Sequence, residues 1–287
     1  RKTSYGEGMK LLARYLSGIK PRLVRYFMSY EEGRFSRGLS HLGLNSSDVL
    51  MVHASWYPHN GFLGRPADMI MALRDHVGVD GLLIMPSLTY QNESSREFLA
   101  RGVPMDVRRS PSQMGLLSEV FRRGKGVRRS LSPTHPLLAW GHRAEEFLAG
   151  HEEALVPFGP QSPFGRLLEW NGKILTIDTP FSTVTFTHFL EDRIAQTLPV
   201  PLYEPEPMEG TVIDYEGVAR KVPVKVLSAT ANRLRRDDLL EAELLKEGVL
   251  KRRRVGNTRL GLLDCRAMTE VVDHMVASGR HFFDSPQ

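Results

Sequence analysis

His188 and Glu191, three residues apart, are the side chains of this sequence best suited to acid–base chemistry. On a helix this spacing places both on one face, where the carboxylate can orient the imidazole or raise its basicity. An imidazole, with a reference pKa near ~6.5, can take a proton from a reacting group at neutral pH. Phe186, Phe189 and Leu190 beside it also fit a buried structural histidine, so the spacing alone leaves both interpretations open.

The residues before this pair predict how it is positioned. A strand-like run over 173–177 is followed by the turn Asp178-Thr179-Pro180 and then by the start of a helix. A strand, a turn and a helix start deliver side chains to the carboxyl edge of a sheet, where open α/β folds bind ligands.

Apolar strands over 49–53 and 81–86 flank a helical pattern over 67–77, which is typical of a βαβ unit. Residues 211–227 alternate like antiparallel strands around a turn at Glu216-Gly217. We therefore predict an α/β fold with a largely parallel central sheet flanked by helices, and a smaller antiparallel β subregion after residue 210.

The composition is that of an ordinary globular chain, with 287 residues, 41% hydrophobic and 25% charged. We expect a basic helical N-terminal extension over 1–34 and a single domain over 35–287. No apolar run reaches the ~18 to 20 residues of a membrane span, and no signal peptide is evident, so we expect a cytoplasmic protein. The single cysteine, Cys265, cannot form an intramolecular disulfide and fits a small buried filler.

The net charge of +5 suits a phosphate-bearing partner, and it is concentrated in two runs, over 122–129 and 251–254. Nucleic-acid binding would call for interleaved aromatics or a reader module, and neither is present. The glycines of the first run leave backbone N–H groups free for a cofactor phosphate. The second run fits a solvated face.

Several familiar chemistries lack their motifs. The sequence has no Gly-x-Ser-x-Gly elbow, no Walker phosphate loop, and no Gly-x-Gly-x-x-Gly turn after the first strand. A metal site at His188 would need a second histidine four residues away, which is missing, so we expect no metal.

Taken together, five separated segments resemble the antibiotic N-acetyltransferases typified by aminoglycoside 3-N-acetyltransferase. They are Val49-Leu50-Met51-Val52-His53-Ala54-Ser55; Gly64-Arg65-Pro66 with Gly81-Leu82-Leu83-Ile84-Met85-Pro86; Met114-Gly115 through Arg129-Ser130; Pro133-Thr134-His135; and Thr185-x-x-His188-x-x-Glu191. The resemblance covers roughly residues 35–278, and the ordered set is more specific than any one motif.

The resemblance implies transfer of an acetyl group from acetyl-CoA to an amine, without a covalent acyl-enzyme. His188 would be the general base in the motif that Thr185 begins, and Glu191 would orient it or contact the substrate ammonium. The expected acetyl-CoA contacts are His53 and Ser55 near the thioester, and Lys125, Arg128, Arg129 and Ser130 at the phosphates. Glu119 and His135 would line the acceptor side.

A polycationic acceptor would be repelled by the net charge and must be attracted locally. The acidic, proline-rich segment that holds Glu204 and Glu206 is therefore expected to form one wall of the acceptor site. His53-Ala54-Ser55 and Gly64-Arg65 depart from the His-Ser-Ser and Gly-Gly common in the family. The acceptor thus stays open between an aminoglycoside, another amino sugar and a biosynthetic amine.

Two other function classes remain alternatives. One is a binding protein that kept the fold and lost the activity, and the other is a hydrolase that uses His188 and Glu191 with water. The expected partner is a small-molecule amine, without nucleic acid, and a homodimer is left open.

Overall fold

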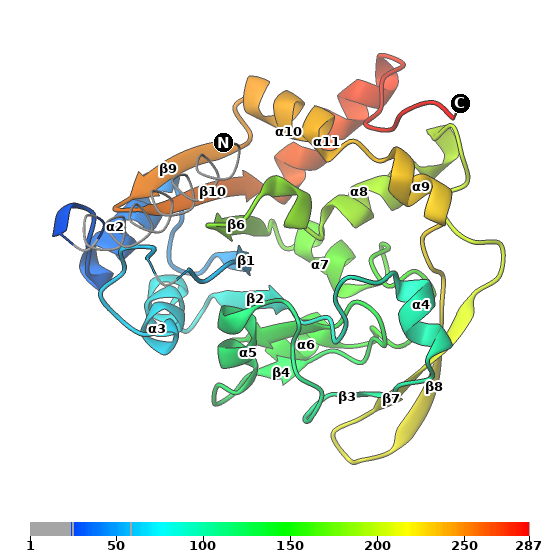
Figure 1. Cartoon of the computed structure of the whole chain (residues 1–287), viewed down its shortest axis with the longest axis horizontal. Helices are drawn as coiled ribbons and strands as arrows, with labels where there is room; N and C mark the ends of the chain where they lie inside the picture. The colour runs from blue at the N-terminus through cyan, green and yellow to red at the C-terminus, as the bar shows by residue number, and fades with distance from the viewer. Residues whose placement is uncertain (1–23, 25, 58, 287) are drawn as a thin grey trace, which may run out of the picture.

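The computed structural model describes residues 24, 26–57 and 59–286, which form two β-sheets flanked by helices (Figure 1). The larger sheet has seven strands. In spatial order these are β4 (Arg128–Arg129), β5 (Leu137–Trp140), β2 (Leu82–Pro86), β1 (Val49–Ala54), β6 (Lys173–Ile177), β10 (Thr258–Asp264) and β9 (Lys251–Val255).

The predicted βαβ unit is confirmed at the centre of this sheet. β1 pairs in parallel with β2 on one side and with β6 on the other, and α3 (Pro66–Val77) connects β1 to β2. The outer strands β5, β4, β10 and β9 are antiparallel to their neighbours. β9 and β10 are joined by a tight turn, which only antiparallel strands can make. The strand connections diverge between β1 and β6, the position where open α/β sheets bind ligands.

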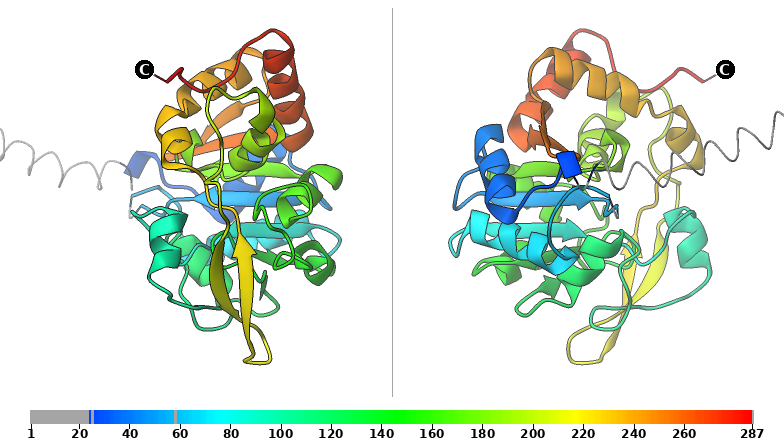
Figure 2. Two further views of the ribbon diagram at one scale, coloured as in Figure 1. Left: turned by 90° about the vertical axis from the view of Figure 1, so that its right-hand side faces the viewer. Right: turned by 60° about the vertical axis from the view of Figure 1, so that its left-hand side comes forward.

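Helices cover both faces of the large sheet (Figures 1 and 2). Alternate residues of β1 enter different cores, since Leu50 and Val52 pack on one face and Met51 on the other. The first face is covered by α2 (Glu32–Leu42), α3 and α5 (Leu116–Arg122). The second is covered by α6 (Ala144–Leu148), α7 (Pro163–Glu169), α8 (Thr187–Arg193), α10 (Asp237–Lys246) and α11 (Cys265–Ala277).

The predicted smaller β subregion is also present. β7 (Met208–Ile213) and β8 (Ala219–Val224) form an antiparallel hairpin, and β3 (Met105–Asp106) joins β7 in parallel. This sheet shares a small core with α4 (Ser95–Ala100) and projects away from the large sheet (Figure 2).

The segments between these layers contain short helices. η1 (Phe181–Thr183) leads from β6 to α8, η2 (Ala195–Thr197) follows α8, and α9 (Ala229–Leu234) precedes α10. The expected extension over 1–34 lies largely outside the described residues. In the part of the chain that the structure describes, no helix is both long enough and apolar enough to cross a membrane.

Candidate active site

The predicted His188 and Glu191 pair is formed on α8. The Nδ1 atom of His188 lies 3.1 Å from Oε2 of Glu191, and the backbone N–H of His188 donates to the carbonyl of Thr185. A carboxylate oxygen only accepts, so Nδ1 carries a proton, and whenever the ring is neutral its basic atom is Nε2. The His188 side chain is 18% exposed and Glu191 is fully buried. The histidine is therefore reachable from solvent, whereas the carboxylate of Glu191 is enclosed by the protein.

Arg235, between α9 and α10, holds the buried carboxylate from the other side. Its Nη2 donates to Glu191 Oε2 over 3.0 Å and to the side chain of Asn232. Its Nε lies 2.5 Å from Oε1, an ion-pair contact that lacks the alignment of a hydrogen bond. A buried carboxylate needs such a cation, because an unpaired buried charge is strongly destabilising. His188, Glu191 and Arg235 thus form one connected chain.

Two aromatic rings lie beside the His188 ring. The ring centroids of Phe158 and His135 lie 5.2 and 5.8 Å from that of His188. Burial, followed by the charge of His188, holds the pKa of His135 well below its usual value, so this ring is neutral. Tyr203 stacks on Phe158 at 6.2 Å and donates to Asp192. These contacts connect the segment after α8 to the surroundings of His188.

The end of β1 brings His53 and Ser55 to the divergence point of the sheet. His53 is opposite Thr176 of β6, and the N–H of Ser55 donates to the Ile177 carbonyl. Burial lowers the pKa of His53 to about 3, and its Nε2 has no hydrogen-bond partner among the described residues. A neutral imidazole with an unused nitrogen thus lies at the expected ligand crevice.

Glu119 belongs to an ion-pair cluster on α5. Arg122 and Arg123 each donate to its carboxylate over 2.7 Å, and the Ser112 N–H donates over 2.8 Å. The hydrogen bond from Arg122 is the main reason that the Glu119 pKa falls to about 2. The carboxylate is thus engaged by residues of its own region.

Arg129 and Ser130 make internal contacts. Arg129 is 3% exposed and donates to the carbonyls of Ser110 and Ser87, and burial lowers its pKa to about 9. The Ser130 hydroxyl accepts from Leu137 N–H and pairs with Nδ1 of His151 over 2.7 Å. Both residues therefore connect β4 and the residue after it to neighbouring segments of the fold.

The other two residues expected at CoA phosphates lie on the surface. Arg128 pairs with Glu145 over 2.9 Å and its guanidinium lies 4.9 Å from the Tyr215 ring centroid. Lys125 is exposed in the turn before β4.

Glu204 and Glu206 of the acidic segment differ in their surroundings. Glu204 is ion-paired with Arg96 of α4 over 2.9 Å and its side chain is 22% exposed. Glu206 is exposed. The segment adjoins the His188 surroundings through Tyr203, described above.

His188 therefore contacts both Glu191 and His135, and Thr185 lies at the start of the same motif. Glu119 belongs to a separate ion-pair cluster. Two residues near the pair were not predicted. They are Arg235 and the half-buried Asp237, whose pKa is raised chiefly by burial and also by the charge of Glu191. No local pattern marks them, because they approach α8 only through tertiary folding.

Comparison with known proteins agrees with this architecture. The family model described as aminoglycoside 3-N-acetyltransferase matches residues 51–277. Aminoglycoside N(3)-acetyltransferase VIII of Streptomyces fradiae is 31% identical over 175 residues, which are 56% of this chain and 60% of that protein. The prophage-derived YokD of Bacillus subtilis is 29% identical over 171 residues, 54% of this chain and 62% of YokD. The matched region thus spans about 60% of the length of these relatives.

Solved structures match over more of the chain. AAC-IIIb in a binary complex with CoASH has a TM-score of 0.71 and 25% identity, and covers 90% of this chain and 99% of its own. The AAC(3)-IVa apoenzyme has a TM-score of 0.70 and 24% identity, and covers 90% of this chain and 93% of its own.

Proposed function

Because the chain belongs to the aminoglycoside 3-N-acetyltransferase family, we propose that it transfers the acetyl group of acetyl-CoA to an amine of an aminoglycoside or a related amino sugar. The family match and the likeness to a CoA-bound structure support the donor. The observation that carries the proposal is the chain of contacts His188–Glu191–Arg235, which holds one reachable imidazole over a buried carboxylate.

In the proposed reaction, Nε2 of His188 accepts a proton from the acceptor amine as its nitrogen attacks the thioester carbonyl. The C–N bond forms, the C–S bond breaks, and the departing thiolate takes the proton that the imidazolium of His188 returns. Glu191 stabilises the imidazolium that forms, and Arg235 keeps this carboxylate in place. Holding both substrates in attack geometry would supply several further kcal/mol, on the order of 7 or more at best.

We place the thioester at the divergence point of β1 and β6. The unused Nε2 of His53 and the hydroxyl of Ser55 can donate to or orient the pantetheine there. The acceptor would approach past His135, with the acidic segment of Glu204 and Glu206 attracting its ammonium groups. The CoA phosphates need cationic partners, and the candidates are the basic runs over 122–129 and 251–254.

The test is a thiol-release assay with acetyl-CoA across aminoglycosides, other amino sugars and simple amines, with the products identified by mass spectrometry. We expect release that depends on the amine and yields one N-acetylated product per thiol. Equal release without an amine would show a hydrolase instead. Absence of acetyl-CoA binding by calorimetry would favour a family member that lost the activity.

A further inference from the structure

A basic groove lies between α2 and β9, at one edge of the large sheet (Figure 1). This α2–β9 groove has a volume of about 250 Å³. In the part of the chain that the structure describes, no carboxylate lines it, and its basic residues are Arg34, Arg37, His41, Arg253 and Arg254. Positive charge of this density favours an anionic partner.

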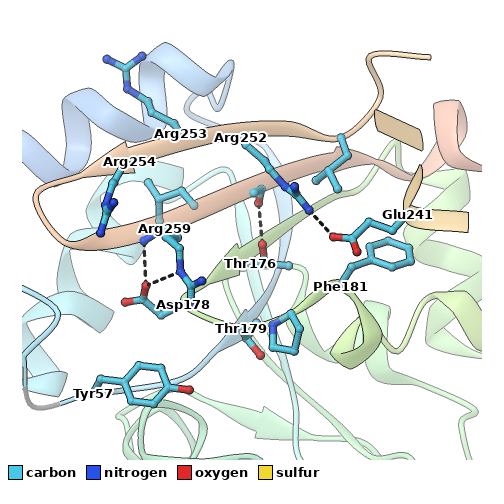
Figure 3. Close-up of a pocket in the computed structure, with 14 residues that line it drawn as sticks. Tyr57, Thr176, Asp178, Thr179, Phe181, Glu241, Arg252, Arg253, Arg254 and Arg259 are labelled. Carbon is cyan, nitrogen blue, oxygen red and sulfur yellow. Dashed lines mark hydrogen bonds and ion pairs between the residues drawn. The ribbon is translucent and has the colours of Figure 1, made fainter. Parts of the chain in front are cut away.

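The periodicities of α2 and β9 produce the groove. The three basic residues of α2 are spaced three and four positions apart, so their side chains lie on one face of the helix. Side chains alternate along β9, and Figure 3 shows Arg253 leaving the strand on the side of α2 and Arg252 on the other side. A Cβ on Gly38 would overlap the side chain of Val255, so helix and strand are in close contact. The fold itself therefore holds the two basic rows together.

Three arginines of the groove have no internal counterion. Arg34, Arg37 and Arg253 are exposed, and none of their side chains makes a hydrogen bond or ion pair with another residue of the described ranges. Arg252, on the other side of β9, is paired with Glu241. Like charges at helical spacing destabilise a helix slightly, and an external anion would relieve this repulsion.

Two exposed aromatic side chains adjoin the groove. Tyr26 and Phe27 are 83% and 72% exposed, and their ring centroids lie 4.9 Å apart. The chain then passes the turn of the β9–β10 hairpin, where the Met28 carbonyl leaves no room for a Cβ at Gly256, and continues into α2. Aromatic rings beside basic residues are typical of surfaces that adsorb to the headgroup region of a bilayer.

An anionic bilayer uses all of these features. A small anion would occupy the groove and leave the aromatic pair without a role. Nucleic acid calls for rings spaced to stack on successive bases, whereas Tyr26 and Phe27 contact each other edge to face. Residues 1–23 add six basic residues and one acidic residue to the sequence, which increases the attraction to an anionic surface.

We propose that the α2–β9 groove and the adjoining aromatic pair attach the protein peripherally to an anionic phospholipid surface. The three unpaired arginines contact lipid phosphates, and Tyr26 and Phe27 enter the headgroup region. α2 covers the face of the large sheet opposite to α8, so this attachment leaves the surroundings of His188 open. It is independent of the proposed acetyl transfer.

The first test is cosedimentation of the full chain with vesicles of phosphatidylcholine, with or without about one third phosphatidylglycerol. We expect binding to the anionic vesicles only. R34Q/R37Q should weaken it roughly tenfold or more, because each basic residue near an anionic surface contributes several-fold. The matched control K125Q/R128Q removes two charges in and just before β4, at the opposite edge of the sheet, and should change binding less than about twofold. Equal losses in both variants, or no binding of the wild type, would overturn the proposal.

F27S tests the apolar part of the attachment. It should weaken binding several-fold, by a factor that stays the same as salt is raised, whereas the effect of R34Q/R37Q should shrink. The control V218S changes a residue that is 53% exposed in the turn of the β7–β8 hairpin, and it should bind like wild type. An F27S variant that binds like wild type would contradict insertion of the aromatic pair and leave only attraction between charges.

Two soluble competitors distinguish the other occupants. Inorganic phosphate, added at constant ionic strength, should not displace the protein from anionic vesicles, and displacement would assign the groove to a small anion. Single-stranded RNA that binds through Arg34 and Arg37 when anionic vesicles do not would assign it to nucleic acid. R34Q/R37Q should keep the circular dichroism spectrum and the acetyl-transfer kcat of the wild type in solution. Vesicle binding as expected in a chain without transferase activity supports this proposal and refutes only the proposed function.

Discussion

Replacing Arg235 by glutamine should destabilise the fold more than the same replacement of an exposed arginine. The reason is that it leaves the buried carboxylate of Glu191 without its cation. Glu191 is fully buried and the Arg235 side chain is 15% exposed, with contacts of 2.5 and 3.0 Å. Two unit charges ~3 Å apart attract by about 5 kcal/mol at an effective dielectric constant near 20. Much of this is offset by desolvation, but removal of one partner of a buried pair typically costs ~3–5 kcal/mol. We expect R235Q to cost about 3 kcal/mol, a large share of an ordinary domain's stability.

The assay is urea unfolding of wild type, R235Q, E191Q and R235Q/E191Q. If the penalty comes from the orphaned charge, E191Q should recover at least about 1.5 kcal/mol of it in the double variant, since neutral amides can pair with each other. The matched control is R236Q, whose arginine has a side chain 38% exposed and pairs with Asp238 and Asp284, and its unfolding midpoint should stay near wild type. A cost below about 1 kcal/mol for R235Q, or strictly additive effects, would refute the reasoning.

Three further predictions concern the site and the buried histidines. His188→Ala should lower kcat by about 10²- to 10⁴-fold with donor affinity near wild type by calorimetry; a variant that retains a third of the rate would exclude this base. E204Q/E206Q should raise KM for a polycationic acceptor roughly twofold to tenfold and leave KM for acetyl-CoA unchanged, so steady-state constants that do not move would remove these residues from the acceptor site. Because burial lowers the pKa of His53 to about 3 and of His151 to about 4, both stay neutral in the fold while the unfolded chain binds protons below pH ~6.5. The free energy of unfolding measured in urea should thus fall by about 2 kcal/mol for each histidine between pH 7 and pH 5. Equal free energies at both pH values would show that the fold does not keep these rings from binding protons.

Local spacing was enough to predict the βαβ unit and the shared helical face of His188 and Glu191, because both follow from backbone geometry within a few residues. The antiparallel pairing of β5 with β2 and of β10 with β6 depends on which distant segments meet, and hydrophobic patterns do not encode that choice. Arg235 escaped prediction for a related reason, since it meets Glu191 only after α9 and α10 fold over α8. For Glu119 and Arg129 the sequence identifies a charged side chain but not the protein groups with which it pairs in the fold.

The two outermost strands of the large sheet have a shared property with a consequence for self-association. β4 at one edge is Arg128–Arg129, and β9 at the other begins with Lys251 and three arginines. An edge strand exposes unpaired N–H and C=O groups that can add a strand from another molecule. Here the addition of β9 to β9 of a second copy would bring two rows of exposed cationic side chains together. The arginine run therefore protects the sheet from growing into a continuous intermolecular ribbon, and neutralising several of its charges at once should make the protein prone to aggregate along that edge.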